Sequence, residues 1–305
     1  MYHFIVNPSS SSGRGKMLWE EIEKKLLAEK IPYLVYMTDG EGAATRFAKE
    51  ITKNGEEVTI IVCGGDGTMN EVVDGISDYS KVTLGCVPTG SSNDLCRDLQ
   101  TPKDPMKMID IVLHPTNIVK MDIGKITHAE GKKNFSVSMG VGFDAAICYE
   151  ANFSKLKNIL NKIKLGKLTY LGISLKQLAG AKKVGATILL DDDKEIKVER
   201  LLFVTCMVHR FEGGGFMFCP EADYSDGMLD VLVVGDVSKM KILSILPTAT
   251  KGKHLGHDGI NMYRAKKVKI ITEQPMHVHA DGESVGVREE VVVSQEENQI
   301  NLILG

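Results

Sequence analysis

The chain has 305 residues, of which 43% are hydrophobic and 25% are charged, and its formal net charge is -3. This composition is ordinary for a globular protein, and the length suits two domains. A charge balance so close to neutral provides no general attraction to nucleic acid, so no nucleic-acid partner is expected. No apolar run approaches the ~20 residues that span a bilayer, and the start "MYHFIVNP" lacks the pattern of a signal peptide. We therefore expect a cytoplasmic protein.

The cysteines form no C-x-x-C pair, and most of them lie in apolar stretches typical of strands or helices. Buried thiols in a reducing compartment are the expectation that follows. The six residues are Cys63, Cys86, Cys96, Cys148, Cys206 and Cys219.

The first 120 residues alternate between apolar runs typical of strands and amphipathic patterns typical of helices. One run, "VTIIVC", is continuously apolar, as expected for a strand buried on both faces of a parallel sheet. Alternating strands and helices predict right-handed βαβ crossovers and therefore a doubly wound, Rossmann-like α/β domain. The expected strands are 2–6, 33–37, 58–63 and 82–87, and the expected helices are 15–30, 41–53, 68–77 and one from Asn93.

The pattern changes after "VKMDIGK" (119–125), where segments of alternating apolar and polar residues dominate. They predict a second domain that is mainly antiparallel, interrupted by one long helical region at about 153–181. We place the nucleotide-binding α/β domain at 1–122 and the β-rich domain at 123–296. The last strand, about 297–305, is free to return to the first domain.

Three glycine-bearing turns follow strands of the expected parallel sheet: "NPSSSSGRGK" (7–16), "CGGDGTMNE" (63–71) and "VPTGSSNDLCRDL" (87–99). Ligands of such sheets bind at the carboxyl ends of the strands. Glycines permit positive φ and leave no side chain between the backbone and a ligand, so the N–H groups of the following helix can face a phosphate. The three turns together predict a nucleotide-phosphate site, although a single G-G-D-G is often only a tight turn.

Two aspartates, Asp66 and Asp94, lie in these turns, where a carboxylate would repel a phosphate. Their presence is explained if they hold Mg²⁺ beside the phosphates, directly or through water. The alternative for Asp94 is that it caps its helix. No G-x-x-x-x-G-K-[ST] motif occurs, and no G-x-G-x-x-G follows the first strand, which argues against a P-loop NTPase and an NAD(H)-dependent reductase.

Four motifs in order resemble the diacylglycerol kinase catalytic family, especially its soluble bacterial lipid-kinase branch, which includes sphingosine-kinase-like enzymes. They are "GGDGTMNEVVDG", "PTGSSNDLCRDL", "GGGFMFCPEADYSDGMLDV" (213–231) and "ADGE" (280–283). The resemblance covers nearly the whole chain. It implies a first domain like those of phosphofructokinases and NAD kinases and a second domain that is a β-sandwich. Ser91 replaces the threonine usual in the second motif, and loop 7–16 is longer than usual.

The resemblance also implies individual roles. Asp281 resembles the general base that takes the proton of the acceptor hydroxyl, and Glu283 would join a charged network around Mg²⁺ at a domain cleft. The other members of that network would be Asp66, Asp94, Arg97 and Asp122. The implied ATP contacts are Asn7, Thr38, Gly64, Gly65, Asp66, Gly67, Thr68, Asn70, Glu71, Gly90, Ser91, Asn93 and Glu283.

A second, structural Mg²⁺ site is implied at Asp223, Asp226 and the backbone carbonyl of Met228. Taken on its own residues, "DYSDGMLD" predicts only a hairpin turn, and so does "HADGE", because Asp-Gly favours one. His277 and His279 alternate on the strand before that turn. We interpret both as structural, because the sequence reveals no third metal ligand.

Between residues 151 and 190 the chain has eight lysines and no acidic residue, with leucines and isoleucines interleaved. A basic amphipathic helix of this kind can lie on an anionic membrane, and the alternative is a solvated face over core leucines. We favour peripheral membrane binding through 153–183, because a lipid acceptor would lie in a bilayer.

These features predict a lipid kinase that uses ATP and Mg²⁺, with diacylglycerol or a related lipid alcohol as acceptor. Sphingoid-type and phosphatidylglycerol-like acceptors remain open, and so does the oligomeric state, a homodimer included. An NAD kinase or a phosphofructokinase is a second interpretation, because both use a related G-G-D-G turn. A third is a non-catalytic lipid- or nucleotide-binding regulator, which would be attractive only if Asp66, Asp281 or Glu283 had been lost.

Overall fold

The computed structural model describes residues 1–153, 176, 178 and 180–305. The chain divides into two compact units: unit 1 comprises residues 1–123 and 296–305, and unit 2 comprises residues 124–295. Among the described residues, no helix combines the length and hydrophobicity needed to cross a membrane. Most of the basic segment 153–183 lies outside the described residues.

Unit 1 is built on a six-stranded sheet with the order β2-β1-β3-β4-β18-β5. Five of these strands run parallel, and only the edge strand β5 is antiparallel to its neighbour β18. The C-terminal strand β18 is thus inserted between β4 and β5. The strands are β1 (Tyr2–Val6), β2 (Tyr33–Met37), β3 (Val58–Gly64), β4 (Val82–Pro88), β5 (Ile118–Met121) and β18 (Ile300–Ile303).

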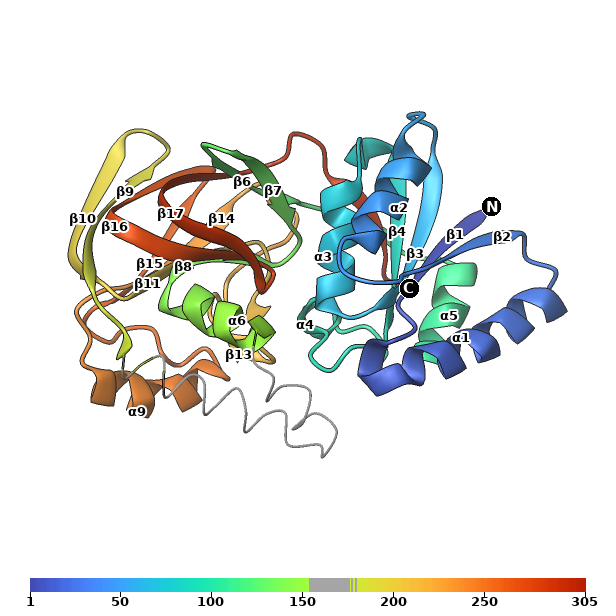
Figure 1. Cartoon of the computed structure of the whole chain (residues 1–305), viewed down its shortest axis with the longest axis horizontal. Helices are drawn as coiled ribbons and strands as arrows, with labels where there is room; N and C mark the ends of the chain where they lie inside the picture. Colours follow the sequence, from blue (N-terminus) through green and yellow to red (C-terminus); the bar gives the residue numbers. More distant parts are fainter. Residues whose placement is uncertain (154–175, 177, 179) are drawn as a thin grey trace. The chain divides into compact units, whose positions relative to one another are not determined.

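Alternation along the central strands of this sheet directs side chains to both faces, as required when helices cover both. Phe4 and Val6 of β1 share one buried cluster with Trp19 and Ile22 of α1 and with Ile109 of α5. Helices α2 and α3 pack against each other (Figure 1). The helices are α1 (Ser10–Ala28), α2 (Ala43–Thr52), α3 (Asp66–Gly75), α4 (Asp94–Asp98) and α5 (Pro105–Leu113), with a 3-10 turn, η1, at Tyr79–Lys81.

Unit 2 is a mainly antiparallel β structure with the order β15-β14-β11-β8-β16-β17-β6-β7, and β9 and β10 branch from β16. The long strands β16 and β17 form its central hairpin. Its strands are β6 (Gly124–His128), β7 (Gly131–Phe135), β8 (Ser138–Gly142), β9 (Val184–Leu190), β10 (Lys194–Leu201), β11 (Phe203–Met207), β12 (Phe211–Glu212), β13 (Phe216–Met217), β14 (Leu229–Val234), β15 (Ile260–Ala265), β16 (Lys267–Ala280) and β17 (Glu283–Gln295).

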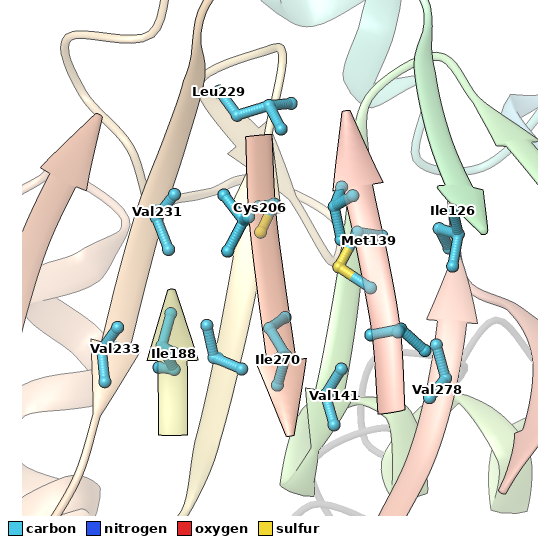
Figure 2. Close-up of a cluster of buried hydrophobic side chains, with 14 of the residues drawn as sticks. Ile126, Met139, Val141, Ile188, Cys206, Leu229, Val231, Val233, Ile270 and Val278 are labelled. Carbon is cyan, nitrogen blue, oxygen red and sulfur yellow. The ribbon is translucent and has the colours of Figure 1, made fainter. Parts of the chain in front are cut away.

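The core of unit 2 is formed by inward-facing residues from most of these strands (Figure 2). Met139 and Val141 of β8 lie in this cluster with Cys206 of β11, Val231 of β14 and Val278 of β16. The period-2 pattern of the sequence produces this core, because alternate residues of each strand point to one face. Two helices accompany the strands: α6 (Phe143–Phe153) and α9 (Lys239–Ala249).

The predicted fold class is confirmed: an α/β unit precedes a mainly antiparallel β unit. The sequence analysis missed helices α5 and α9, and the helix expected from Asn93 is only the five-residue α4. Five of the cysteines are buried as expected, Cys148 is half-buried, and all six are free thiols.

Candidate active site

Two glycine turns of unit 1 touch each other at the carboxyl ends of β3 and β4. A Cβ atom on Gly65 would lie 2.9 Å from the Cα of Gly90, and a Cβ on Gly90 would lie 2.5 Å from the Cα of Gly65. The backbone N–H of Thr89 donates to the carbonyl of Gly64 at 2.9 Å. The side chain of Asn93, at φ 49°, accepts from the N–H of Gly90 at 3.1 Å and donates to its carbonyl at 2.9 Å. Glycine is required at both contacts because backbone lies where a side chain would start.

The lengthened loop after β1 joins the same group of turns. The Asn7 side chain donates to the Thr68 hydroxyl at 3.1 Å, and its backbone N–H donates to the carbonyl of Cys63 at 2.9 Å. The Ser11 hydroxyl donates to the carbonyl of Thr89 at 2.6 Å. Ser11, Ser12 and Gly13 all have positive φ, so this part of the loop is not regular helix. The extra serines therefore bind one turn of the site to another.

The acidic residues of unit 1 are held near these turns. Asp66 is the first residue of α3, and its carboxylate accepts from the N–H of Leu95, the second residue of α4, at 3.4 Å. Asp94 is buried, and its carboxylate is paired with Arg97. Asp122 is also buried and accepts from the Gln299 side chain at 2.8 Å. The structure thus brings Asp66, Asp94 and Arg97 to the adjoining ends of α3 and α4.

Two of the expected ATP contacts support the loop from within. Asn70 is fully buried, and the carboxylate of Glu71 accepts from the N–H of Ala44 at 3.0 Å, in the first turn of α2. Thr38 follows β2 and binds the carbonyl of Val6 through its backbone N–H at 2.9 Å. In this conformation the Glu71 carboxylate ties α3 to the start of α2.

The residues of these turns fit the groups that the sequence implies. A phosphate chain binds to backbone N–H groups that no side chain covers. The contact of Gly65 with Gly90 leaves no room for a side chain at either position. Mg²⁺ prefers carboxylate oxygens, and Asp66 and Asp94 lie on neighbouring helix starts that are tied by the hydrogen bond to Leu95. Asp66 and Asp94 are therefore the residues that would hold Mg²⁺ beside the nucleotide.

In unit 2, Asp281 forms a two-residue turn with Gly282 between β16 and β17. Both residues have positive φ, 49° and 85°, as in the tight hairpin turns that Asp-Gly favours. The Asp281 carboxylate accepts four hydrogen bonds: from the N–H of Ser136 at 2.7 Å, its hydroxyl at 2.9 Å, and the N–H groups of Val137 at 2.8 Å and Ser138 at 2.9 Å. These bonds use the four acceptor positions of a carboxylate, so Asp281 must release one of them to take a proton.

A buried acidic cluster lies next to this turn. The Nε2 atom of His279, a fully buried residue, is 3.1 Å from a carboxylate oxygen of Glu212 and 3.4 Å from one of Asp144. Burial raises the pKa of the Asp144 carboxyl, although His279 opposes this shift. Burial likewise raises the pKa of the nearby Cys148 thiol to about 11, so this thiol stays protonated at neutral pH. Glu283 begins β17 directly after the turn.

Comparison with known proteins assigns both units. Residues 1–126 match the diacylglycerol kinase catalytic domain, and residues 137–301 match the YegS C-terminal NAD kinase beta sandwich-like domain. The chain belongs to the diacylglycerol kinase family. This lipid kinase is 31% identical over 290 residues to a diacylglycerol kinase of Staphylococcus epidermidis, covering 92% of this chain and 85% of that protein.

A further relative and a solved structure are similar to this chain. YtlR of Bacillus subtilis, whose name marks it as a candidate lipid kinase, is 29% identical over 291 residues, covering 93% of this chain and 94% of that protein. A crystal structure of a diacylglycerol kinase from Bacillus anthracis str. Sterne has the same fold, with a TM-score of 0.71, 21% identity and coverage of 100% and 96% of the two chains. The match of residues 1–126 to the diacylglycerol kinase catalytic domain replaces the interpretations as NAD kinase or phosphofructokinase with that of a lipid kinase.

In this lipid kinase, each residue of the expected structural Mg²⁺ site already has a partner within the protein. The Asp223 carboxylate accepts from the N–H and hydroxyl of Ser225, and that of Asp226 accepts from the N–H of Met228 and is paired with Arg264. The carbonyl of Met228 accepts from the Gln295 side chain at 2.9 Å. A cation here would have to compete with Arg264.

Three residues of unit 2 were missed by the sequence analysis: Ser136, Asp144 and Glu212. The sequence revealed no third metal ligand beside His277 and His279, and the structure places two acidic residues, Asp144 and Glu212, against His279. The available signal was the position of His279 two residues before Asp281. Its partners lie far away in sequence and meet it only through the folded sheet.

Proposed function

We propose that this lipid kinase transfers the γ-phosphoryl group of ATP to a lipid hydroxyl, with diacylglycerol as acceptor and phosphatidic acid as product. The contact between Gly65 and Gly90, with Asp66 and Asp94 at its edge, carries the nucleotide part of the proposal. The acceptor is inferred from the relatives named diacylglycerol kinase, among them the Staphylococcus epidermidis protein.

Phosphoryl transfer depends mainly on positioning and charge neutralisation. The glycine turns would bind the phosphate chain of ATP through backbone N–H groups, and Asp66 and Asp94 would hold Mg²⁺. When bound, Mg²⁺ neutralises the charge that develops on the phosphates. Arg97 keeps Asp94 oriented through their ion pair.

The acceptor groups belong to unit 2. Asp281 would take the proton of the acceptor hydroxyl, and it can do so once one of its four hydrogen bonds is released. Glu283, two residues later, is the second carboxylate assigned to the reaction. We further propose that the basic segment 153–183 binds an anionic membrane in which the acceptor lies. This part of the proposal rests on the sequence alone.

The experiment is a labelled-ATP assay with purified protein and mixed micelles that contain diacylglycerol, a sphingoid base or phosphatidylglycerol, with and without Mg²⁺. The proposal predicts a labelled lipid product that requires Mg²⁺, with the highest kcat/KM for diacylglycerol. A higher kcat/KM for another lipid would overturn the acceptor assignment alone. No labelled product with any lipid would favour the non-catalytic regulator.

A further inference from the structure

His279 lies between the turn that carries Asp281 and two half-buried carboxylates of unit 2. Its Nδ1 atom accepts a hydrogen bond of 3.1 Å from the backbone N–H of Gly282, and its Nε2 atom faces Glu212 and Asp144. The residue is fully buried, so water does not compete for either nitrogen. The ring thus spans from the turn to the acidic pair.

The hydrogen bond from Gly282 determines where the proton of His279 resides. A neutral imidazole has one N–H, and an Nδ1 atom that accepts a hydrogen bond leaves that proton on Nε2. The Nε2 atom lies 3.1 Å from a carboxylate oxygen of Glu212 and 3.4 Å from one of Asp144, but neither contact has the geometry of a hydrogen bond. The same arrangement disfavours a cation at the cluster, because a metal on Nε2 would move the proton to Nδ1, against the N–H of Gly282.

The titratable groups that surround the ring are all acidic. Helix α6 contributes Asp144 and Cys148, β12 contributes Glu212, and β17 contributes Glu283 near Cys148. Burial opposes a charge on the ring, but Cys148, Glu212 and Asp144 raise the pKa of His279 well above its ordinary value. A second proton would nevertheless have to replace the Gly282 hydrogen bond at Nδ1. The hydrogen bond that Nδ1 accepts from Gly282 is compatible only with an unprotonated Nδ1.

Room for this arrangement is provided by a glycine on the neighbouring strand. A Cβ atom on Gly140 of β8 would lie 1.9 Å from the Asp144 carboxylate and 2.6 Å from Nε2 of His279. Asp144 is itself fixed, because its other oxygen accepts from the N–H of Ala145 at 2.7 Å. The Asp144 carboxylate is thus held by the backbone of α6.

We propose that His279 is a positioning residue of the kinase: it holds the turn of Asp281 and Gly282, and the start of β17 at Glu283, through the acceptor Nδ1. Asp144 and Glu212 lie against Nε2 on the other side of the ring. This inference rests on the proposed function, because Asp281 and Glu283 are the carboxylates assigned to the reaction.

Two substitutions distinguish the role of Nδ1 from that of Nε2. In His279→Asn the amide oxygen can take the position of Nδ1 and keep the Gly282 hydrogen bond, whereas in His279→Gln the amide reaches only the position of Nε2. We expect His279→Gln to lower kcat roughly 10²-fold with an unchanged KM for ATP, as misplacement of reacting groups does, and His279→Asn to retain most of kcat. His277→Gln, two residues earlier on the same strand, is the matched control and should behave like the wild type.

A second readout does not need the lipid reaction: hydrogen exchange of the Gly282 amide, measured by NMR in the lipid-free protein. We expect protection in the wild type and His279→Asn, and its loss in His279→Gln. Equal protection of the Gly282 amide and equal kcat in both variants would overturn the inference. Equal losses of protection and kcat in both variants would also overturn it, because His279 would then be only a core residue. If the Gly282 amide of the wild type is protected from exchange but the protein phosphorylates no lipid, the proposed function is contradicted instead.

Discussion

Asp281 is bound twice by Ser136, through a backbone N–H at 2.7 Å and a hydroxyl at 2.9 Å, both on the same carboxylate oxygen. The other oxygen accepts from the N–H groups of Val137 and Ser138. The proposed base is therefore also a structural clamp between the β16–β17 turn and the segment before β8. Its substitution should affect stability and catalysis together.

For Asp281→Asn we expect kcat to fall by about 10²-fold or more while ATP still binds, because the substitution removes the base and leaves unit 1 unchanged. The melting temperature should also fall, because the amide nitrogen would face N–H donors and leave one unsatisfied, at about 1–3 kcal/mol. For a domain of this size each kcal/mol corresponds to ~2–4 °C. Thermal melts, ATP titration and the lipid assay measure the three effects.

Ser136→Ala is the control for that experiment, since it removes one donor and keeps the carboxylate with its three backbone hydrogen bonds. It should lose about 1 kcal/mol of stability and retain most of kcat. If Asp281→Asn kept more than a tenth of the wild-type kcat, the assignment of the base would be wrong.

Asp66→Ala should raise the Mg²⁺ concentration needed for half-maximal rate about tenfold or more, equivalent to ~1.4 kcal/mol of binding free energy. The reason is its proposed place as a metal ligand beside the phosphates. A Mg²⁺ titration of the initial rate measures the shift. A variant with normal rate and unchanged Mg²⁺ dependence would show that Asp66 only ties α3 to the N–H of Leu95.

Gly90→Ala should weaken ATP binding about tenfold or more, because its Cβ would lie 2.5 Å from the Cα of Gly65 and push the two turns apart. Isothermal titration with ATP gives the change in Kd. The matched control is Gly40→Ala, where no atom lies within 4 Å of an added Cβ and φ is not in the left-handed region. Equal affinities of the two variants would contradict the assignment of the contact to the nucleotide site.

The expected metal site at Asp223, Asp226 and Met228 makes a separate prediction about stability. Mg²⁺ should raise the melting temperature of the wild type, because a ligand bound only to the folded state stabilises it, and Asp226→Ala should abolish this rise and lower activity. Arg264→Gln, which removes the competing cation, should keep or enlarge the response. Differential scanning fluorimetry at several Mg²⁺ concentrations is the measurement. If the wild type melts at the same temperature with and without Mg²⁺, the segment binds no metal and is only a turn held by Arg264.

The sequence predicted the features that depend on local pattern. Glycines placed after apolar runs marked turns at the carboxyl ends of the parallel strands, which share one edge of a sheet, but the contact of Gly65 with Gly90 appears only in the structure. Helix α5 was missed although Asp104 before Pro105 is a helix-start signal, and α9 was missed because it contains Pro247, which argues against a helix.

The cluster of His279, Asp144 and Glu212 could not be predicted from spacing. His279 is paired with Gly140 across β16 and β8, and this register brings α6 beside it. Strand pairing between segments more than a hundred residues apart has no local signature. For the same reason, the four hydrogen bonds of Asp281 were invisible in "HADGE", where only the turn could be recognised.

The most direct test of the central claim is to follow the γ-phosphoryl group of ATP itself. The protein is incubated with γ-¹⁸O-labelled ATP, Mg²⁺ and diacylglycerol in mixed micelles, and the products are analysed by mass spectrometry. Our account predicts labelled phosphatidic acid in amounts equal to the ADP formed, and an amount lower by about 10²-fold or more in the same time from Asp281→Asn. Label found only in inorganic phosphate, or no lipid product at all from the wild type, would contradict it.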